Sequence, residues 1–183
     1  GDYTVDVSIW DANREIEPVK ASQKLYVRLK DNKLDMSNII FEKEVTPTEE
    51  DGPFVKSGYL MTPWLISTIP AAMEEFYVYS EVYNSDYKLG GNGAYIEKHQ
   101  LRNLDVDSVF ENYSIVKRVN TSQVNVILKR VDLKTLPDGT YSYTIELFNR
   151  ENELVGSTGK QFYRQSDIPS LKNGQRTAEV ADF

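Results

Sequence analysis

Few residues of this sequence have the types and spacing that catalysis or metal binding requires. His99 is the only histidine, and the chain contains no cysteine. Thiol nucleophiles, thiolate zinc sites and any catalyst with two imidazoles are therefore excluded. A metal site or general base at His99 would need converging partners of other kinds, so we expect His99 to be a solvent-facing strand residue. We predict no catalytic residue, no metal site and no cofactor.

Two acidic groups offer the oxygen ligands that calcium prefers, namely the pair Asp105 and Asp107 and the Glu-Glu-Asp run at residues 49–51. Neither follows the D-x-[DN]-x-[DN]-G spacing of a calcium loop, which favours solvated loops. Hydrolysis by two carboxylates is compatible with 28 Asp and Glu residues, but nothing singles out a pair. No nucleophile elbow, Walker loop or dinucleotide-binding fingerprint occurs. A small hydrolase is the weakest of the functional hypotheses.

Aromatic residues are the unusual feature of the composition, with 12 Tyr, 7 Phe and 2 Trp. Alternation places Tyr77, Tyr79 and Tyr83 on one face of a single strand, and Trp64 lies in a segment bounded by prolines. Aromatic rings flanked by polar groups can stack on sugars or form a protein interface. These four are the candidate ligand-binding residues. The same tyrosine face could instead be the surface on which another part of the chain packs.

Charge and hydropathy exclude further classes of protein. The chain carries 21 Lys and Arg against 28 Asp and Glu, which gives a net charge of −7 and no concentrated basic segment, so we expect no nucleic-acid partner. No apolar run approaches the roughly 20 residues that span a bilayer, so no transmembrane segment is expected. Gly1 is followed directly by a strand-like run, and we assume that a native leader has been removed ahead of it.

Short alternating runs rich in Val, Ile, Tyr, Phe and Thr recur along the chain, separated by turn residues, and they predict an all-β fold of about ten strands. The first run places Tyr3, Val5, Val7 and Ile9 on one face. The clearest local signal is at residues 131–141, where one strand ends, a Pro-Asp-Gly turn follows and a new strand starts at Tyr141.

The segment 62–75 interrupts this alternation, because Pro63 and Pro70 each remove a backbone donor and restrict the residue before them. It is the candidate domain boundary. We expect a small N-terminal β-domain at residues 1–70, docked on a β-sandwich at residues 71–168. Residues 169–183 have no periodicity and are expected to be a flexible tail or a truncated continuation.

One element carries a resemblance to a known family. The pattern D-L-x-x-L-P-x-G-x-Y is matched by Asp132, Leu133, Leu136, Pro137, Gly139 and Tyr141. It resembles the closing hairpin of immunoglobulin-like domains in bacterial secreted and cell-envelope proteins. Together with the strand at 76–84, the arrangement is similar to the β-rich regions of GWxTD-domain envelope proteins, although the signature motif of that family is absent. The resemblance covers roughly residues 72–166 and implies an extracytoplasmic location and a non-catalytic role. Together with the strand pattern, it leads us to expect an all-β fold of two immunoglobulin-like β-sandwich domains, the first small and docked on the second.

The leading functional hypothesis is a structural or protein-interaction module of a bacterial secreted or cell-envelope protein, periplasmic, associated with the outer membrane or secreted. Its partner is another protein or another domain of the same envelope protein, bound through strand edges and aromatic patches, as in adhesion. The alternative is a carbohydrate-binding module whose stacking residues are Trp64 and the tyrosine face, with a glycan as the ligand. The two differ in what they require, since sugar stacking needs exposed coplanar rings and an interaction module needs a flat apolar patch or an open strand edge.

Overall fold

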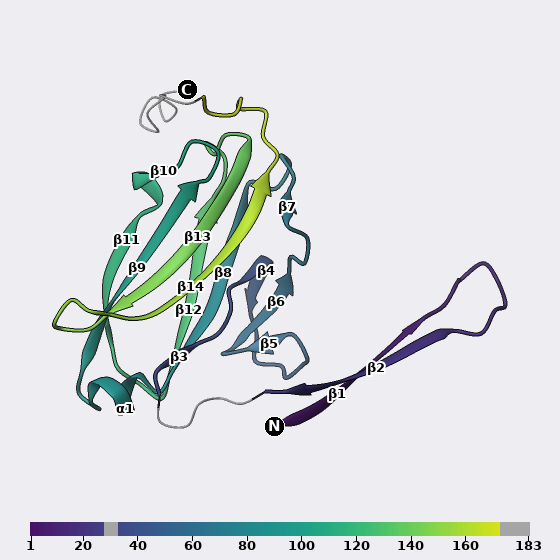
Figure 1. Cartoon of the computed structure of the whole chain (residues 1–183), viewed down its shortest axis with the longest axis horizontal. Coiled ribbons are helices and arrows are strands. Elements are labelled where there is room, and N and C mark those ends of the chain that lie inside the picture. The colour runs from purple at the N-terminus through teal and green to yellow at the C-terminus, as the bar shows by residue number, and fades with distance from the viewer. Residues whose placement is uncertain (28–32, 173–183) are drawn as a thin grey trace. The chain divides into compact units, whose positions relative to one another are not determined.

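The chain folds almost entirely into β-strands, as the alternation predicts. The computed structural model describes residues 1–27 and 33–172, and the chain separates into two compact units, Gly1–Asp31 and Asn32–Phe183 (Figure 1). The helical segments described are short, namely α1 (Ser85–Leu89) and the 3-10 turn η1 (Glu111–Tyr113). Part of the expected tail, residues 173–183, lies outside the described residues.

The first unit is an antiparallel hairpin of β1 (Asp2–Ile9) and β2 (Val19–Tyr26). Its register pairs Tyr3 with Leu25 and Ile9 with Val19, so the apolar side chains of both strands share one face. A two-stranded ribbon has no second layer against which to bury that face. Each residue of both strands is accordingly exposed.

The second unit contains two six-stranded sheets, named here after their central strands. In the β9 sheet the order is β10-β9-β13-β14-β7, with β11 also paired to β9; in the β8 sheet it is β12-β8-β4-β6-β5, with β3 also paired to β8. The β9 sheet consists of β7 (Thr68–Ile69), β9 (Ala94–Asn103), β10 (Ser108–Val109), β11 (Ile115–Asn120), β13 (Gly139–Phe148) and β14 (Leu154–Arg164). The β8 sheet consists of β3 (Asp35–Met36), β4 (Ile40–Pro47), β5 (Val55–Lys56), β6 (Tyr59–Pro63), β8 (Glu75–Tyr83) and β12 (Val124–Asp132).

A single core lies between these two sheets. Burial alternates along β13, where every second residue from Tyr141 to Leu147 is buried, and β8 contributes Phe76, Val78 and Val82 from the facing sheet. Phe162 of β14 lies between them, with its ring centroid 5.5 Å from that of Phe76. The two inner faces therefore interdigitate as the faces of a sandwich do.

The division of the chain into units differs from the one predicted at residue 70. Strand β4 hydrogen-bonds to β8 with Ile40 opposite Tyr79, and β7 runs parallel to β14 with Ile69 opposite Arg164. Residues 40–69 therefore supply strands to both sheets of the sandwich formed by residues 75–164. The structure places the division at residues 31 and 32, because strands that share a sheet and a core cannot pack as separate domains.

The Pro-Asp-Gly turn at 137–139 connects the two sheets by a corner, since β12 and β13 belong to different sheets. Gly139 has φ = 152°, and a side chain at this position would lie 2.7 Å from the Asp105 carboxylate. The buried Tyr141 donates its hydroxyl hydrogen to the carbonyl oxygen of Pro137, four residues upstream, at 3.0 Å. This hydrogen bond fixes the path of the chain into β13 and has the geometry of a tyrosine corner.

Replacement of Tyr141 by Phe tests the contribution of this corner. The variant Tyr141→Phe keeps the packed ring and leaves the Pro137 carbonyl without its partner, so we expect the free energy of unfolding to fall by about 1–2 kcal/mol. Urea denaturation measures the change. The matched control is Tyr163→Phe, which removes an exposed hydroxyl bonded to Asp138, and its expected cost is below about 0.5 kcal/mol. Equal losses in the two variants would contradict a special role for the corner.

Candidate functional site

The three candidate tyrosines Tyr77, Tyr79 and Tyr83 lie together on the outer face of the β8 sheet, because they alternate with the core-facing residues of β8. Tyr79 is only 2% exposed, and the Lys56 amine lies 5.7 Å from the centroid of its ring. The hydroxyl groups of Tyr79 and Tyr83 both donate to the carboxylate of Glu81 between them. Much of this face is therefore occupied by contacts within the chain.

Electrostatics at this face follow from the shared carboxylate. Burial, together with the hydrogen bond to Glu81, raises the pKa of Tyr83 to about 12 and raises the pKa of Tyr79 further. Burial acts to raise the pKa of Glu81, but the two tyrosine hydrogen bonds outweigh it and the pKa is lowered. Glu81 is consequently ionised, and its carboxylate accepts hydrogen bonds that hold the rings of Tyr79 and Tyr83 in place.

Trp64, the fourth candidate, is located elsewhere. Its ring is partly buried against the hydrophobic core, and its indole nitrogen donates to the carbonyl oxygen of Thr68 at 3.1 Å. Sugar stacking needs ring faces that are open to solvent. The carbohydrate-binding alternative therefore rests on the sequence pattern alone.

His99 is buried rather than solvent-facing, so that expectation was wrong. Its side chain is 1% exposed, with Nδ1 2.8 Å from the Tyr143 hydroxyl and Nε2 2.5 Å from Glu97 Oε1. The parity of β9 explains the burial, because His99 and Glu97 alternate in phase with the apolar residues Tyr95 and Leu101, which face the core. That parity was present in the sequence, but the polar character of the segment obscured it.

The buried carboxylate of Glu97 holds this network together. Burial acts to raise its pKa, but hydrogen bonds from His99 and Lys117 outweigh it, and the pKa of Glu97 lies below its ordinary value. Lys117 Nζ lies 2.8 Å from Glu97 Oε1. An ionised Glu97 accepts from His99 Nε2–H, so a neutral imidazole can accept the Tyr143 hydroxyl hydrogen at Nδ1. Burial raises the pKa of Tyr143 as well, which keeps its hydroxyl protonated.

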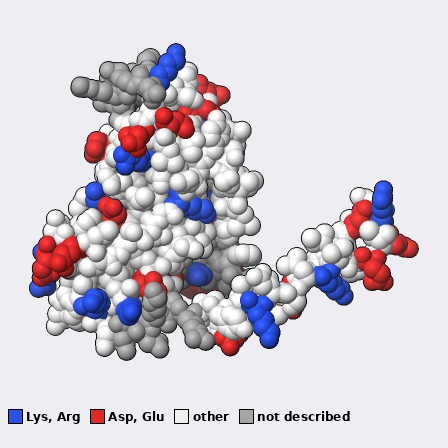
Figure 2. All heavy atoms as spheres, viewed as in Figure 1, with Lys and Arg blue, Asp and Glu red and all other residues white. Residues whose placement is uncertain are grey.

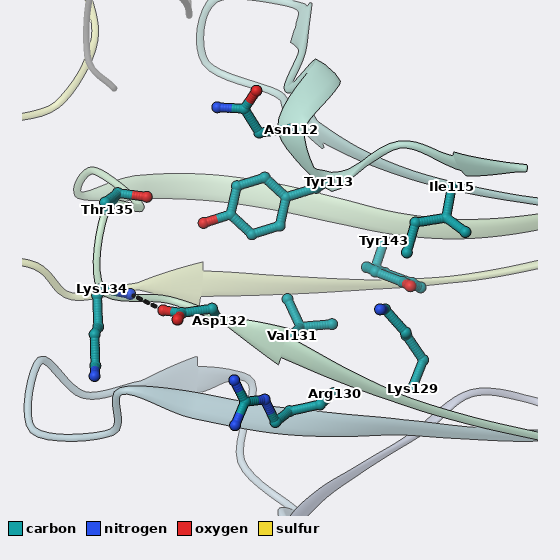
Figure 3. Close-up of a pocket in the computed structure, with 10 residues that line it drawn as sticks. All are labelled: Asn112, Tyr113, Ile115, Lys129, Arg130, Val131, Asp132, Lys134, Thr135 and Tyr143. Atoms are coloured by element: carbon teal, nitrogen blue, oxygen red, sulfur yellow. Dashed lines mark hydrogen bonds between the residues drawn. The ribbon is translucent and has the colours of Figure 1, made fainter. Parts of the chain in front are cut away.

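Tyr143 of this network also lines a cavity, to which the edge strands β11 and β12 both contribute residues (Figure 3). Its volume is about 530 Å³. Figure 3 shows Tyr113 and Tyr143 on the side of the β9 sheet, with Lys129 extending toward them from β12. Its lining residues are Asn112, Tyr113, Ile115, Lys129, Arg130, Val131, Asp132, Lys134, Thr135 and Tyr143.

The cationic side chains of this cavity differ in their partners. Arg130 pairs with Glu75 at 3.2 Å, and Lys134 pairs with Glu74 at 3.2 Å. Lys129 is half-buried, and its side chain has no hydrogen bond or ion pair within residues 1–27 and 33–172. Its ammonium group therefore lacks an ion-pair partner, in a cavity that is also lined by Asp132, whose carboxylate accepts from the backbone N–H of Lys134.

Within the described part of the chain, no group of three or more His, Cys, Asp or Glu residues could hold a metal ion. Acidic and basic side chains are interspersed over the face shown in Figure 2. The cavity can contribute a cation, hydroxyl and amide groups and an apolar wall, which are means of recognition.

No family model matches the chain, and no curated protein matches it. Among the residues that the structure describes, none of the helices is long and apolar enough to span a membrane.

Glu97 provides a test of the buried network through its pH dependence. In Glu97→Gln we expect the free energy of unfolding at pH 7 to fall by about 2 kcal/mol, because the substitution removes the charged carboxylate that accepts hydrogen bonds from His99 and Lys117. Since the pKa of Glu97 is lowered in the folded chain, this contribution is complete above the unfolded value of 4.5 and is lost as the pH falls through the folded value.

Chemical denaturation of both proteins between pH 7 and pH 3 measures this difference. Glu146→Gln is the matched control, because Glu146 forms a partly exposed pair with Lys98 at 3.6 Å and its loss should cost below about 0.5 kcal/mol. A difference between wild type and Glu97→Gln that stays constant across this range would refute the assignment.

Proposed function

We propose that the protein is a non-catalytic protein-interaction module of a bacterial secreted or cell-envelope protein. The observation that carries the proposal is the β1–β2 hairpin, which presents an apolar face and free strand edges. Exposure reaches 57% for Tyr3, 42% for Val5, 47% for Val7 and 67% for Ile9. A contiguous apolar surface of this kind is characteristic of a contact with another protein.

Physical chemistry explains why the hairpin needs a partner. A two-stranded ribbon is at best marginally stable in water by itself, and its unpaired backbone groups can template further strand pairing. Burial of apolar side chains stabilises by roughly 25 cal/mol per Å² of surface removed from water. Binding of a partner to this face, or pairing of a partner strand with a free edge of the hairpin, would therefore order the hairpin and supply the free energy of the contact.

The topology of the second unit supports the proposed immunoglobulin-like fold. The proposed extracytoplasmic location is supported separately, by the resemblance of the closing hairpin to domains of bacterial secreted and cell-envelope proteins. The central orders β12-β8-β4 and β9-β13-β14 match the two sheets of an immunoglobulin-type sandwich. The hydrogen bond from Tyr141 to Pro137 adds the corner found in such domains. In this proposal the sandwich is the scaffold, and the hairpin is the element that binds another protein or another domain of the same envelope protein.

Site-specific photo-crosslinking in the cells that produce the protein tests this function. A photoreactive phenylalanine analogue is placed at Val7 in β1, and the matched control carries it at Asn13, an exposed residue between β1 and β2. We expect the Val7 position to give a discrete adduct of higher mass and the Asn13 position to give little. Absence of intermolecular adducts at both positions would contradict the proposal, as would equal yields.

A further inference from the structure

Strand β12 is an open edge of the second unit. Within the described residues it pairs with β8 and with no other strand, so one row of its backbone donors and acceptors is unpaired. Its outer face carries the apolar residues Val124 and Val126, which are 45% and 39% exposed. Its inner face carries Lys129, whose ammonium group extends into the cavity without a partner among the described residues.

The side chains along the free edge of β12 limit which strands can pair with it. An inward-pointing lysine on an edge strand discourages pairing, because an added strand would bury the ammonium group without a counter-charge. A strand that places a carboxylate opposite Lys129 removes this penalty. A strand that pairs well with β12 therefore has two different faces. Its polar face points into the cavity and carries an acidic residue, and its other face carries apolar residues that lie beside Val126.

Strand β1 has this pattern. Its second edge is free, since it pairs only with β2 among the described residues. One face of β1 is polar and the other is apolar; the polar face carries Asp2, Thr4, Asp6 and Ser8, and the apolar face carries Tyr3, Val5, Val7 and Ile9. The carboxylate and the apolar side chains that the β12 edge requires are thus both present in one strand.

We propose that β1 of one copy adds to the free edge of β12 in a second copy, antiparallel, with Asp6 opposite Lys129. This inference rests on the proposed function, because it names the partner of the hairpin. In this register Val7 lies beside Leu128 and Ile9 beside Val126. The antiparallel register places Tyr3, whose hydroxyl group can donate to a carboxylate, beside Asp132, whereas a parallel strand with the same charge pair would place the aliphatic Ile9 there, which favours the antiparallel choice.

The cavity suits the polar face of the incoming strand. With Asp6 directed inward, Thr4 and Ser8 also face the cavity, where Asn112 and Thr135 supply hydrogen-bonding groups. The added strand would extend the β8 sheet opposite β11 and cover the cavity. Its apolar face would continue the outer surface of β12 at Val124 and Val126.

The contact joins different surfaces of the two copies. Such a heterologous interface leaves one free hairpin and one free β12 edge at the ends of every open assembly. Association therefore either continues to longer species or closes into a ring, and its extent depends on concentration. Reversible association of this kind is measured directly by sedimentation velocity.

Charge reversal provides the first test, performed on the full chain. We expect Asp6→Lys and Lys129→Glu each to lower the apparent association constant about tenfold or more, because each places like charges opposite one another. An equimolar mixture of the two variants pairs opposite charges again, and it should recover wild-type association. Asp2→Lys is the matched control, since Asp2 pairs beyond the end of β12 in this register, and it should change the constant little.

Cysteine trapping provides the second test, and the absence of native cysteine makes it specific. Copies carrying Val7→Cys are mixed with copies carrying Leu128→Cys under oxidising conditions, and a mixed disulfide-linked dimer is expected. In the control, copies carrying Val124→Cys take the place of those carrying Leu128→Cys. Position 124 lies about 13 Å along the strand from position 128, so little mixed dimer with Val7→Cys is expected. Circular dichroism establishes that each variant is folded.

The outcomes separate this inference from the proposed function. A chain that stays monomeric at every concentration, association unchanged by Asp6→Lys, or equal trapping at positions 124 and 128 would each overturn the pairing with a second copy. A photo-crosslinked adduct of Val7 with a different protein would also overturn it and leave the interaction module standing. An adduct of twice the chain mass, lost in Lys129→Glu, supports both.

Discussion

The aromatic contact between the two sheets is the constraint on which the rest of the second unit depends. The Phe41 and Phe76 rings from the β8 sheet lie with centroids 4.6 Å apart, and the Phe162 ring from the β9 sheet meets both at 5.5 Å. Tyr141 stacks on Phe162 from the neighbouring strand β13. Because these residues are separated by as much as 121 positions along the chain, from 41 to 162, the core forms only when strands from both ends of the unit come together. The sheets are consequently long-range structures, and chain segments far apart in sequence must meet before this contact can form.

Arg164, Glu97 and His99 are tolerated inside the sandwich because neighbouring groups supply them with hydrogen-bond partners. Arg164 is 3% exposed, and its guanidinium donates to the carbonyl oxygens of Pro70 and Met73 at 2.7 and 2.8 Å. It thereby fixes the proline-containing segment that precedes β8 against the end of β14. Glu97 and His99 satisfy one another in the same way on β9 of the same sheet. A buried charge without such partners would cost several kcal/mol, so these contacts specify the arrangement of the strands as much as they stabilise it.

Sequence periodicity predicted the strands and the common face of Tyr77, Tyr79 and Tyr83, because alternation depends on neighbouring residues only. It could not show that β4 pairs with β8 or that β7 joins β14, since the choice of strand partner depends on residues far away in the chain. Pro63 and Pro70 therefore suggested a domain boundary where the structure has a crossover between sheets. The cavity beside Lys129 also escaped prediction, because it is formed by β11, β12 and β13 together and has no local motif.

The central claim is that residues 33–172 form one cooperative unit that does not require the hairpin. Urea denaturation of a variant lacking residues 1–27 tests this most directly. The deletion removes Trp10 and leaves Trp64 as the only tryptophan, and Trp64 packs against the core. The account predicts a single cooperative fluorescence transition with the midpoint of the full chain. A broad transition, or a large loss of stability, would contradict it and make the hairpin part of the fold.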